Sequence, residues 1–159
     1  MSSFYIETSI PSFYFEIRSE PAMIARREWT RQWWMQLTPR DLVVTSPAVL
    51  DELRRGQFHS KSETLGLLSE LPLLQINSAV EEIVEAYIAH KLMPADPFGD
   101  ALHLALASYH RCDFLVTWNC SHLANAKKYG HIRRVNAILG LQNPTLVTAL
   151  ELLGEESLS

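Results

Sequence analysis

The sequence predicts an α/β protein in which helices cover both faces of one parallel β-sheet. Short apolar runs rich in β-branched and aromatic residues alternate along the chain with longer segments of helical periodicity. This alternation favours parallel pairing, because each helical segment then forms the crossover to the next strand. Five strands are expected, at residues 4–6, 42–45, 73–76, 114–118 and 145–148.

The composition is close to that of an average water-soluble domain. Hydrophobic residues make up 47% and charged residues 20% of the chain, and the lack of repeats or linkers predicts a single domain over residues 1–159. The net charge of −4 excludes a global basic field, so nucleic acid must be contacted through a local patch or through metal ions. Cys112 and Cys120 are too few for a disulfide framework, and no secretion signal or membrane-spanning stretch is found. We therefore expect a cytoplasmic protein with no membrane contact.

The first strand is followed by two helices. The run Phe-Tyr-Ile at residues 4–6 ends at Glu7, and Pro11 then permits a turn into a short helix. Residues 20–37 have helical periodicity with a tryptophan-rich stripe. Packing of this stripe in the core is favoured over its use as a platform for nucleobases.

Three further helices are expected before residue 92. Ser46 followed by Pro47 is a typical helix start, with serine as the N-cap and proline at the first helical position, and Gly56 is a suitable C-cap. Residues 60–71 form the next helical segment, which a proline ends. An asparagine or serine then caps a helix over residues 77–91.

The C-terminal half contains the stretch that organises the chain. A helix begins at Asp100, leads into the fourth strand, and is followed by Asn119 just past the end of that strand. A short helix over residues 120–128 is expected next, with Gly130 ending it. The tail from Ala149 is expected to be helical.

Four polar residues fall at equivalent places in this scheme. Crossovers between parallel strands are right-handed, so the carboxyl ends of the strands, where ligands bind in such sheets, share one edge. Glu7 ends the first strand and Asn119 ends the fourth, while Glu52 lies in the helix after the second strand and Asp100 begins the helix before the fourth. The sequence therefore predicts that these four side chains meet.

Three carboxylates at one edge would repel each other unless a positive group lay among them. No lysine or arginine occupies the key positions of these segments, so a divalent cation is the simplest compensation. Oxygen-only ligands select Mg²⁺ or Mn²⁺ over zinc, and such ions activate water and neutralise charge that develops on a phosphate. The predicted reaction is metal-dependent hydrolysis of a phosphodiester.

The segments around these residues resemble the PIN-domain ribonucleases, and most closely the VapC-like toxins of bacterial toxin–antitoxin pairs. Four motifs carry the resemblance, in the family's order: Ile-Glu-Thr-Ser at 6–9, Val-Leu-Asp-Glu-Leu at 49–53, Asp-Ala-Leu-His-Leu-Ala at 100–105 and Val-Thr-Trp-Asn at 116–119. The resemblance implies a three-layer α/β/α sandwich with strand order 3-2-1-4-5 and Mg²⁺- or Mn²⁺-dependent cleavage of RNA. It also implies a homodimer and neutralisation by a small antitoxin protein.

The resemblance also assigns roles to individual residues. The implied catalytic set is Glu7, Glu52, Asp100 and Asn119, of which the three acids would hold the metal. Thr8 or Ser9 would supply the hydroxyl beside the first acid. The sequence departs from the commonest family pattern twice, since aspartate is usual at the first position and frequent at the fourth.

Several further residues near these motifs are candidates with alternative interpretations. His122 and Asn125 follow the fourth strand at helical spacing and are candidates for contact with substrate. Asp96 is a rival to Asp100 for the third acidic position. A structural role is favoured over a catalytic one for His103.

Basic residues lie at two places near the predicted site. The set Lys127, Lys128, His131, Arg133 and Arg134, like the pair Arg54 and Arg55, is compatible with RNA phosphate binding and equally with a solvated face.

Three function classes remain in view at this point. An RNA-cleaving enzyme is the first, and a PIN-like module that binds RNA or protein without turnover is the second. A phosphatase or receiver-like protein is disfavoured, because both require an aspartate at the end of the first strand, where this chain has Glu7.

Overall fold

The structure is a computed structural model that describes residues 2–92, 99–119, 123 and 126–154. It confirms an α/β fold built on a parallel sheet. The strands are β1 (Ser3–Ile6), β2 (Leu42–Val44), β3 (Phe114–Val116) and β4 (Thr145–Val147). They are ordered β2-β1-β3-β4, and each neighbouring pair is parallel. The carboxyl ends of the strands therefore lie at one edge, as expected.

The prediction of a fifth strand at residues 73–76 is wrong. Leu73 forms one isolated parallel bridge with Thr45, made by hydrogen bonds from Thr45 N to the Pro72 carbonyl (3.1 Å) and from Leu74 N to the Thr45 carbonyl (2.8 Å). The neighbouring strand β2 ends at Val44, and the chain turns into the next helix directly afterwards. Residues 74–76 therefore have no extended backbone of β2 beside them to pair with, and the described sheet has four strands.

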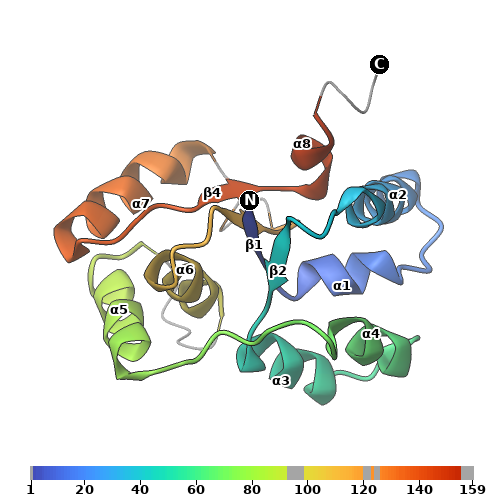
Figure 1. Ribbon diagram of the computed structural model, residues 1–159, viewed down its shortest axis with the longest axis horizontal. Coiled ribbons are helices and arrows are strands. Elements are labelled where there is room, and N and C mark those ends of the chain that lie inside the picture. The colour runs from blue at the N-terminus through green and yellow to red at the C-terminus, as the bar shows by residue number, and fades with distance from the viewer. Residues whose placement is uncertain (1, 93–98, 120–122, 124–125, 155–159) are drawn as a thin grey trace.

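Helices form layers on both sides of the sheet (Figure 1). One side carries α1 (Ser9–Tyr14), α2 (Pro21–Gln36) and α8 (Ala149–Leu153). The other side carries α5 (Ser78–Ala89), α6 (Asp100–Tyr109) and α7 (Ala126–Leu139). Two further helices, α3 (Pro47–Arg55) and α4 (Lys61–Leu68), lie beyond the β2 edge.

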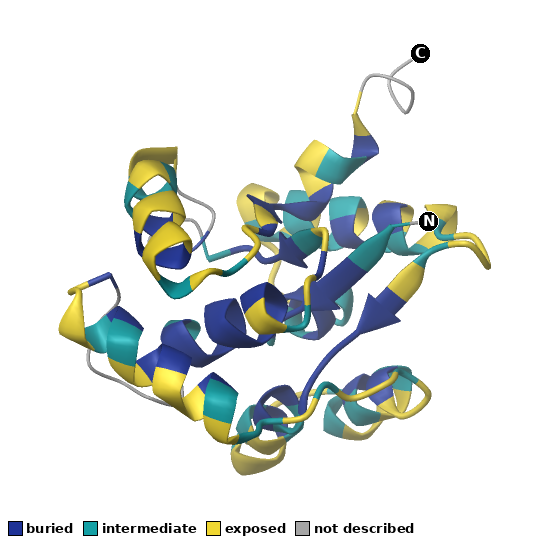
Figure 2. Ribbon diagram, turned by 60° about the vertical axis from the view of Figure 1, so that its left-hand side comes forward, coloured by how far each residue is buried: buried dark blue, intermediate teal, exposed yellow. Residues whose placement is uncertain are grey.

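The core is densest around β1 and α6. Tyr5 and Ile6 of β1 are fully buried, and every α6 residue from Ala101 to Ser108 is buried (Figure 2). A helix that is apolar on nearly all sides is stable only inside a protein. The core thus fixes α6 against β1, which holds the first turn of α6 next to the end of that strand.

Helix α7 differs from the expected short helix that ends at Gly130. It runs from Ala126 to Leu139 and passes through Gly130 without a break. Glycine lowers helix stability without forbidding the helical conformation, and the neighbouring residues on both sides favour the helix here. The first residues of the predicted segment, at 120–122, 124 and 125, lie outside the described residues.

We expect Gly130→Ala to raise the free energy of unfolding by about 0.5–1 kcal/mol. A Cβ atom added at Gly130 meets nothing within 4 Å, so the gain in helix propensity is not offset by a clash. Urea denaturation measures the change. Gly140→Ala is the matched control, because Gly140 has a φ of +71° and should lose stability on substitution. A destabilised Gly130→Ala variant would contradict this interpretation of α7.

Two smaller expectations concern membranes and cysteines. Across the described helices, none combines the length and apolar character needed to cross a membrane. Cys112 is a free, buried thiol, and burial raises its pKa to about 11. Cys120 lies outside the described residues.

Candidate active site at the carboxyl edge of the sheet

Glu7 lies directly after β1 and is buried, with 6% of its surface exposed. Its Oε1 accepts a hydrogen bond from Ser9 N (2.9 Å) and a second one from the Ser9 hydroxyl. Burial raises the pKa of Glu7, and the nearby charge of His103 and the hydroxyls of Ser9 and Thr117 only partly oppose the rise. A carboxylate that is buried in this way is stabilised by a neighbouring cation.

The start of α1 is tied to the end of β3 through two hydroxyl groups. Trp118 N donates to Ser9 Oγ (2.8 Å), and Asn119 N donates to Thr117 Oγ1 (2.9 Å). The Ser9 and Thr117 hydroxyls are 3.5 Å apart. Thr117 was not predicted as a site residue. The two-residue period of a strand places it on the same side as Asn119, and that signal was available in the sequence.

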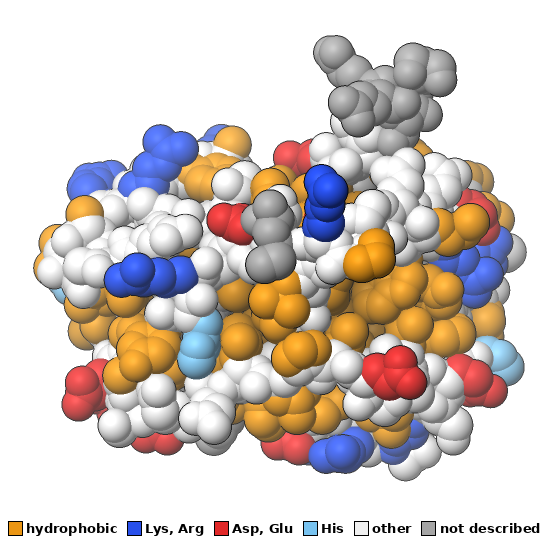
Figure 3. All heavy atoms as spheres, viewed as in Figure 1, with side chains coloured by type: hydrophobic (Ala, Val, Ile, Leu, Met, Phe, Trp, Pro, Cys, Tyr) orange, Lys and Arg blue, Asp and Glu red, His pale blue; other side chains and the backbone are white. Residues whose placement is uncertain are grey.

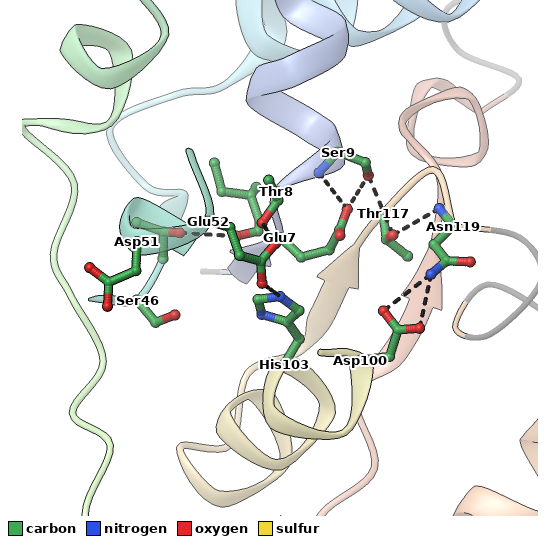
Figure 4. Close-up of polar contacts among 12 residues, drawn as sticks. Glu7, Thr8, Ser9, Ser46, Asp51, Glu52, Asp100, His103, Thr117 and Asn119 are labelled. Atoms are coloured by element: carbon green, nitrogen blue, oxygen red, sulfur yellow. Dashed lines mark hydrogen bonds and ion pairs between the residues drawn. The ribbon is translucent and has the colours of Figure 1, made fainter. Parts of the chain in front are cut away.

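Asn119 and Asp100 meet directly, as the sequence predicted. Asn119 Nδ2 lies 3.1 Å from Asp100 Oδ1 and 3.0 Å from Oδ2, so one amide group donates to both carboxylate oxygens. Asp100 is the first residue of α6, and Asn119 follows β3 (Figure 4). The buried α6 helix therefore positions one partner, and the sheet positions the other.

Glu52 is held by Thr8 and by His103. Thr8 Oγ1 donates to Glu52 Oε2 (2.5 Å), and His103 Nε2 lies 3.0 Å from Glu52 Oε1. The other ring nitrogen of His103 is 2.8 Å from the Tyr5 hydroxyl, which in turn lies 2.8 Å from Ser46 Oγ. This buried chain of polar groups joins β1, α3 and α6 behind the carboxylate.

His103 is a basic group beside the acids that the sequence did not reveal. Burial by itself lowers its pKa, but the hydrogen bond with Glu52 and the charges of Glu7, Glu52 and Asp100 outweigh burial and raise it. For Glu52 the effect of burial is likewise outweighed by His103, so the pKa of Glu52 is lowered. The structural role favoured for His103 is therefore combined with an electrostatic one. The signal in the sequence was its place three residues after Asp100 on the same helix.

The residues predicted to form the site thus lie at one edge of the sheet in two hydrogen-bonded groups (Figure 4). One group contains Glu7, Asn119 and Asp100, and the other contains Glu52. Their donor chemistry fits a hard divalent ion, since all the candidate ligands are oxygen atoms and one carboxylate is buried. In the part of the chain that is described, no three His, Cys, Asp or Glu side chains are grouped closely enough to hold a metal ion. The carboxylates contact hydroxyl, amide and imidazole groups instead, so ion binding would require some of them to turn.

The sequence predicted several other candidate residues. His122, Asn125 and Asp96 lie outside the described residues. On the face of the molecule in Figure 3, basic side chains gather over α7, the helix that carries most of the predicted basic set. Arg54 is exposed and lies 3.8 Å from Asp51, which points away from the site in Figure 4.

The PIN domain family matches the chain over residues 4–129, which include all the motifs described above. The chain belongs to the PIN domain family, whose members are generally nucleases. A comparison with curated proteins finds no significant match. The family resemblance predicted from the sequence is therefore confirmed, while the toxin subtype stays a prediction.

Asn119→Asp should make the stability of the protein depend on divalent ions. The new carboxylate would face Asp100 at about 3 Å, so we expect a loss of about 1–3 kcal/mol in a chelating buffer. Mg²⁺ should restore stability to this variant more than to the unmodified protein. Thermal unfolding with and without Mg²⁺ measures the difference. Asn119→Ala removes the hydrogen bonds without adding charge, and an equal response to Mg²⁺ in both variants would argue against an ion site here.

Proposed function

We propose that the protein is a divalent-metal-dependent endoribonuclease. The observation that carries the proposal is the hydrogen-bonded set at the carboxyl edge of the sheet. It joins Asp100 to Asn119 and Glu52 to Thr8, with Glu7 between them in the same PIN-family chain. Such an edge is where open α/β sheets bind their ligands.

The residues of this set have distinct roles in the proposal. Glu7, Glu52 and Asp100 would hold Mg²⁺ or Mn²⁺. Such an ion, when bound, would neutralise charge on the phosphate and lower the pKa of an attacking water. The Asn119 amide orients that water or a phosphate oxygen by hydrogen bonding. The Thr8 hydroxyl holds the side chain of Glu52, and the Ser9 hydroxyl holds that of Glu7.

The reaction is hydrolysis at phosphorus. A water oxygen forms the new bond to phosphorus while the bond to the 3′ oxygen breaks in line with it. The water loses one proton to solvent or a neighbouring carboxylate, and the leaving oxygen takes up one. The products are a 5′-phosphate and a 3′-hydroxyl end.

Purified protein and 5′-labelled single-stranded RNA test this function. We expect cleavage with Mg²⁺ or Mn²⁺, none with a chelator, and product ends that carry a 5′-phosphate. A matched DNA strand examines the preference for RNA. Cleavage that persists at full rate in the chelator would reject the metal-dependent reaction.

We further propose that the protein is a cytoplasmic toxin that forms a homodimer and is neutralised by a small antitoxin. The support is the resemblance of its four motifs to those of VapC-like proteins. Expression of the chain alone should stop cell growth, and co-expression of a small protein encoded directly upstream should restore it. Normal growth at high expression of an active nuclease would contradict the toxin role.

A second candidate function is a PIN-like module that binds RNA or protein without turnover. Asn119 occupies both oxygens of Asp100, and His103 and Thr8 each occupy one oxygen of Glu52, so the carboxylates already have partners. Calorimetric titration with Mg²⁺ and Mn²⁺ separates the two functions. Failure to bind either ion at millimolar concentration would favour the module.

A further inference from the structure

The candidate site is acidic, and so is the chain as a whole, with a net charge of −4. An RNA strand that approaches Glu7, Glu52 and Asp100 is itself a polyanion. Apart from any ion, its phosphates need a fixed positive group near the acids, because charges of one sign at this distance repel each other. Helix α2 supplies such a group in Arg26.

Arg26 is half-buried, and its guanidinium lies beside two aromatic rings that pack edge to face. The guanidinium carbon is 5.4 Å from the centre of the Trp118 ring and 5.5 Å from that of Phe13. Trp118 is the residue before Asn119, and its backbone N–H donates to Ser9 Oγ. Arg26 thus contacts the ring of a residue whose backbone N–H takes part in the hydrogen bonds of the site.

The position of Arg26 follows from the topology. Strands β1 and β2 are parallel, so the chain that connects them must return from the carboxyl edge of the sheet to its amino edge. Helix α2 belongs to this connection. Its first turns therefore lie near the carboxyl edge, where β1 has just ended. Arg26 belongs to these turns, and it reaches Trp118 just beyond β3.

Two contacts fix this part of α2 to Trp118, and a third lies within the helix. The rings of Trp29 and Trp118 are stacked with centroids 6.1 Å apart and an angle of 25°. Trp118 Nε1 donates to Thr30 Oγ1 (2.8 Å), and Thr30 Oγ1 donates to the Arg26 carbonyl (2.6 Å). The backbone of Arg26 is therefore held in a defined position relative to the acids.

Two neighbouring arginines, Arg18 and Arg27, differ from Arg26 in having a carboxylate partner. Arg18 is paired with Glu16 at 2.8 Å, and Arg27 with Glu28 at 3.1 Å. Arg26 has no carboxylate partner within the described ranges. Contact with the rings of Trp118 and Phe13 does not use the hydrogen-bonding capacity of the Arg26 N–H groups, and a guanidinium can donate two hydrogen bonds to one phosphate.

We propose that Arg26 binds a phosphate of the RNA strand beside the bond to be cleaved. This inference rests on the proposed function and adds a specific substrate contact to it. The aromatic pair orients the guanidinium, so that the bound phosphate sets the position of the strand against Glu7, Glu52 and Asp100. Arg26 is a substrate-binding residue and takes no part in bond breaking.

The test measures RNA affinity in an Asp100→Asn background, which is expected to be inactive, with Mg²⁺ present. Fluorescence anisotropy of a labelled single-stranded oligonucleotide is followed over a series of KCl concentrations. For Arg26→Gln we expect about 10-fold weaker binding and a slope of log K against log salt that is smaller by about 0.7, the value for one phosphate contact on a single strand. Arg27→Gln, a change in the next residue, should leave the slope as it is.

Arg26→Lys separates charge from packing, because it keeps the charge but loses the planar guanidinium that contacts the two rings. We expect the lysine variant to keep the parent's salt slope and to bind RNA a few-fold more weakly. A slope unchanged by Arg26→Gln, or lost equally in the lysine variant, would overturn the assignment of Arg26 while the parent still binds RNA. A parent that binds no RNA at any salt concentration would overturn the assignment together with the proposed function.

Discussion

Glu52→Gln and Asp100→Asn should each reduce RNA cleavage by at least about 100-fold if our proposal that both acids hold the metal is correct. Loss of a metal ligand costs at least as much as loss of a residue that hydrogen-bonds to a ligand. Each substitution removes one negative charge and almost no volume. The glutamine carbonyl can still accept from Thr8, and the asparagine carbonyl can still accept from Asn119. Rates of single-turnover cleavage of labelled RNA, with circular dichroism spectra of both variants, measure the effect.

Asp51→Asn is the matched control for this prediction. Asp51 precedes Glu52 on α3, carries the same charge, and has a side chain that is 66% exposed and near Arg54. Its substitution should leave the cleavage rate within about two-fold, because exposed charges of this kind contribute little. Full activity in both site variants would show that these acids are not the catalytic ones.

His103→Leu should lower the free energy of unfolding by about 2–4 kcal/mol, because it leaves buried polar groups without partners. The imidazole contacts Glu52 through one nitrogen and the Tyr5 hydroxyl through the other, and leucine of similar size can do neither. For a chain of this length the fall in Tm is roughly 5–15 °C. Differential scanning calorimetry in a chelating buffer gives the value.

Two controls and a pH series make the His103 result specific. His103→Gln keeps one polar contact and should lose less. His110→Leu alters a histidine outside the site, which lies 3.0 Å from the Gln75 carbonyl and packs against the Tyr109 ring. The folded-state pKa of His103 is raised above its ordinary value of 6.5. Its contribution to stability is therefore complete below that value and is lost as the pH rises through the folded-state pKa. A leucine variant with the same pH dependence as the parent above pH 6.5 would contradict the charged histidine.

Local patterns were sufficient for most of the elements. Ser46 and Pro47 were read correctly as the start of α3, and Asp100 as the start of α6, because helix starts depend on neighbouring residues. The strand at 73–76 failed for a non-local reason, since its partner β2 had already ended. Gly130 failed as a helix stop because a single glycine lowers helix propensity only slightly.

The candidate site divides in the same way. Its acids could be placed at one edge from topology alone, because the carboxyl ends of parallel strands coincide. The contacts of His103 could not be predicted, because its partners Glu52 and Tyr5 are 51 and 98 residues away in the sequence. The basic residues considered from the sequence likewise did not include Arg26, which lies near the site only through its contacts with Trp118 and Phe13.

The sequence by itself determined that this is a parallel α/β protein of the PIN family with three acids around the carboxyl edge of its sheet. Only the tertiary structure decided what those acids contact: a buried histidine, the Asn119 amide, and the hydroxyls of Thr8 and Ser9. The physical reason is the range of the forces involved. Backbone preferences and hydrophobic periodicity act over a few residues, whereas burial and charge compensation depend on which distant segments the core packs together.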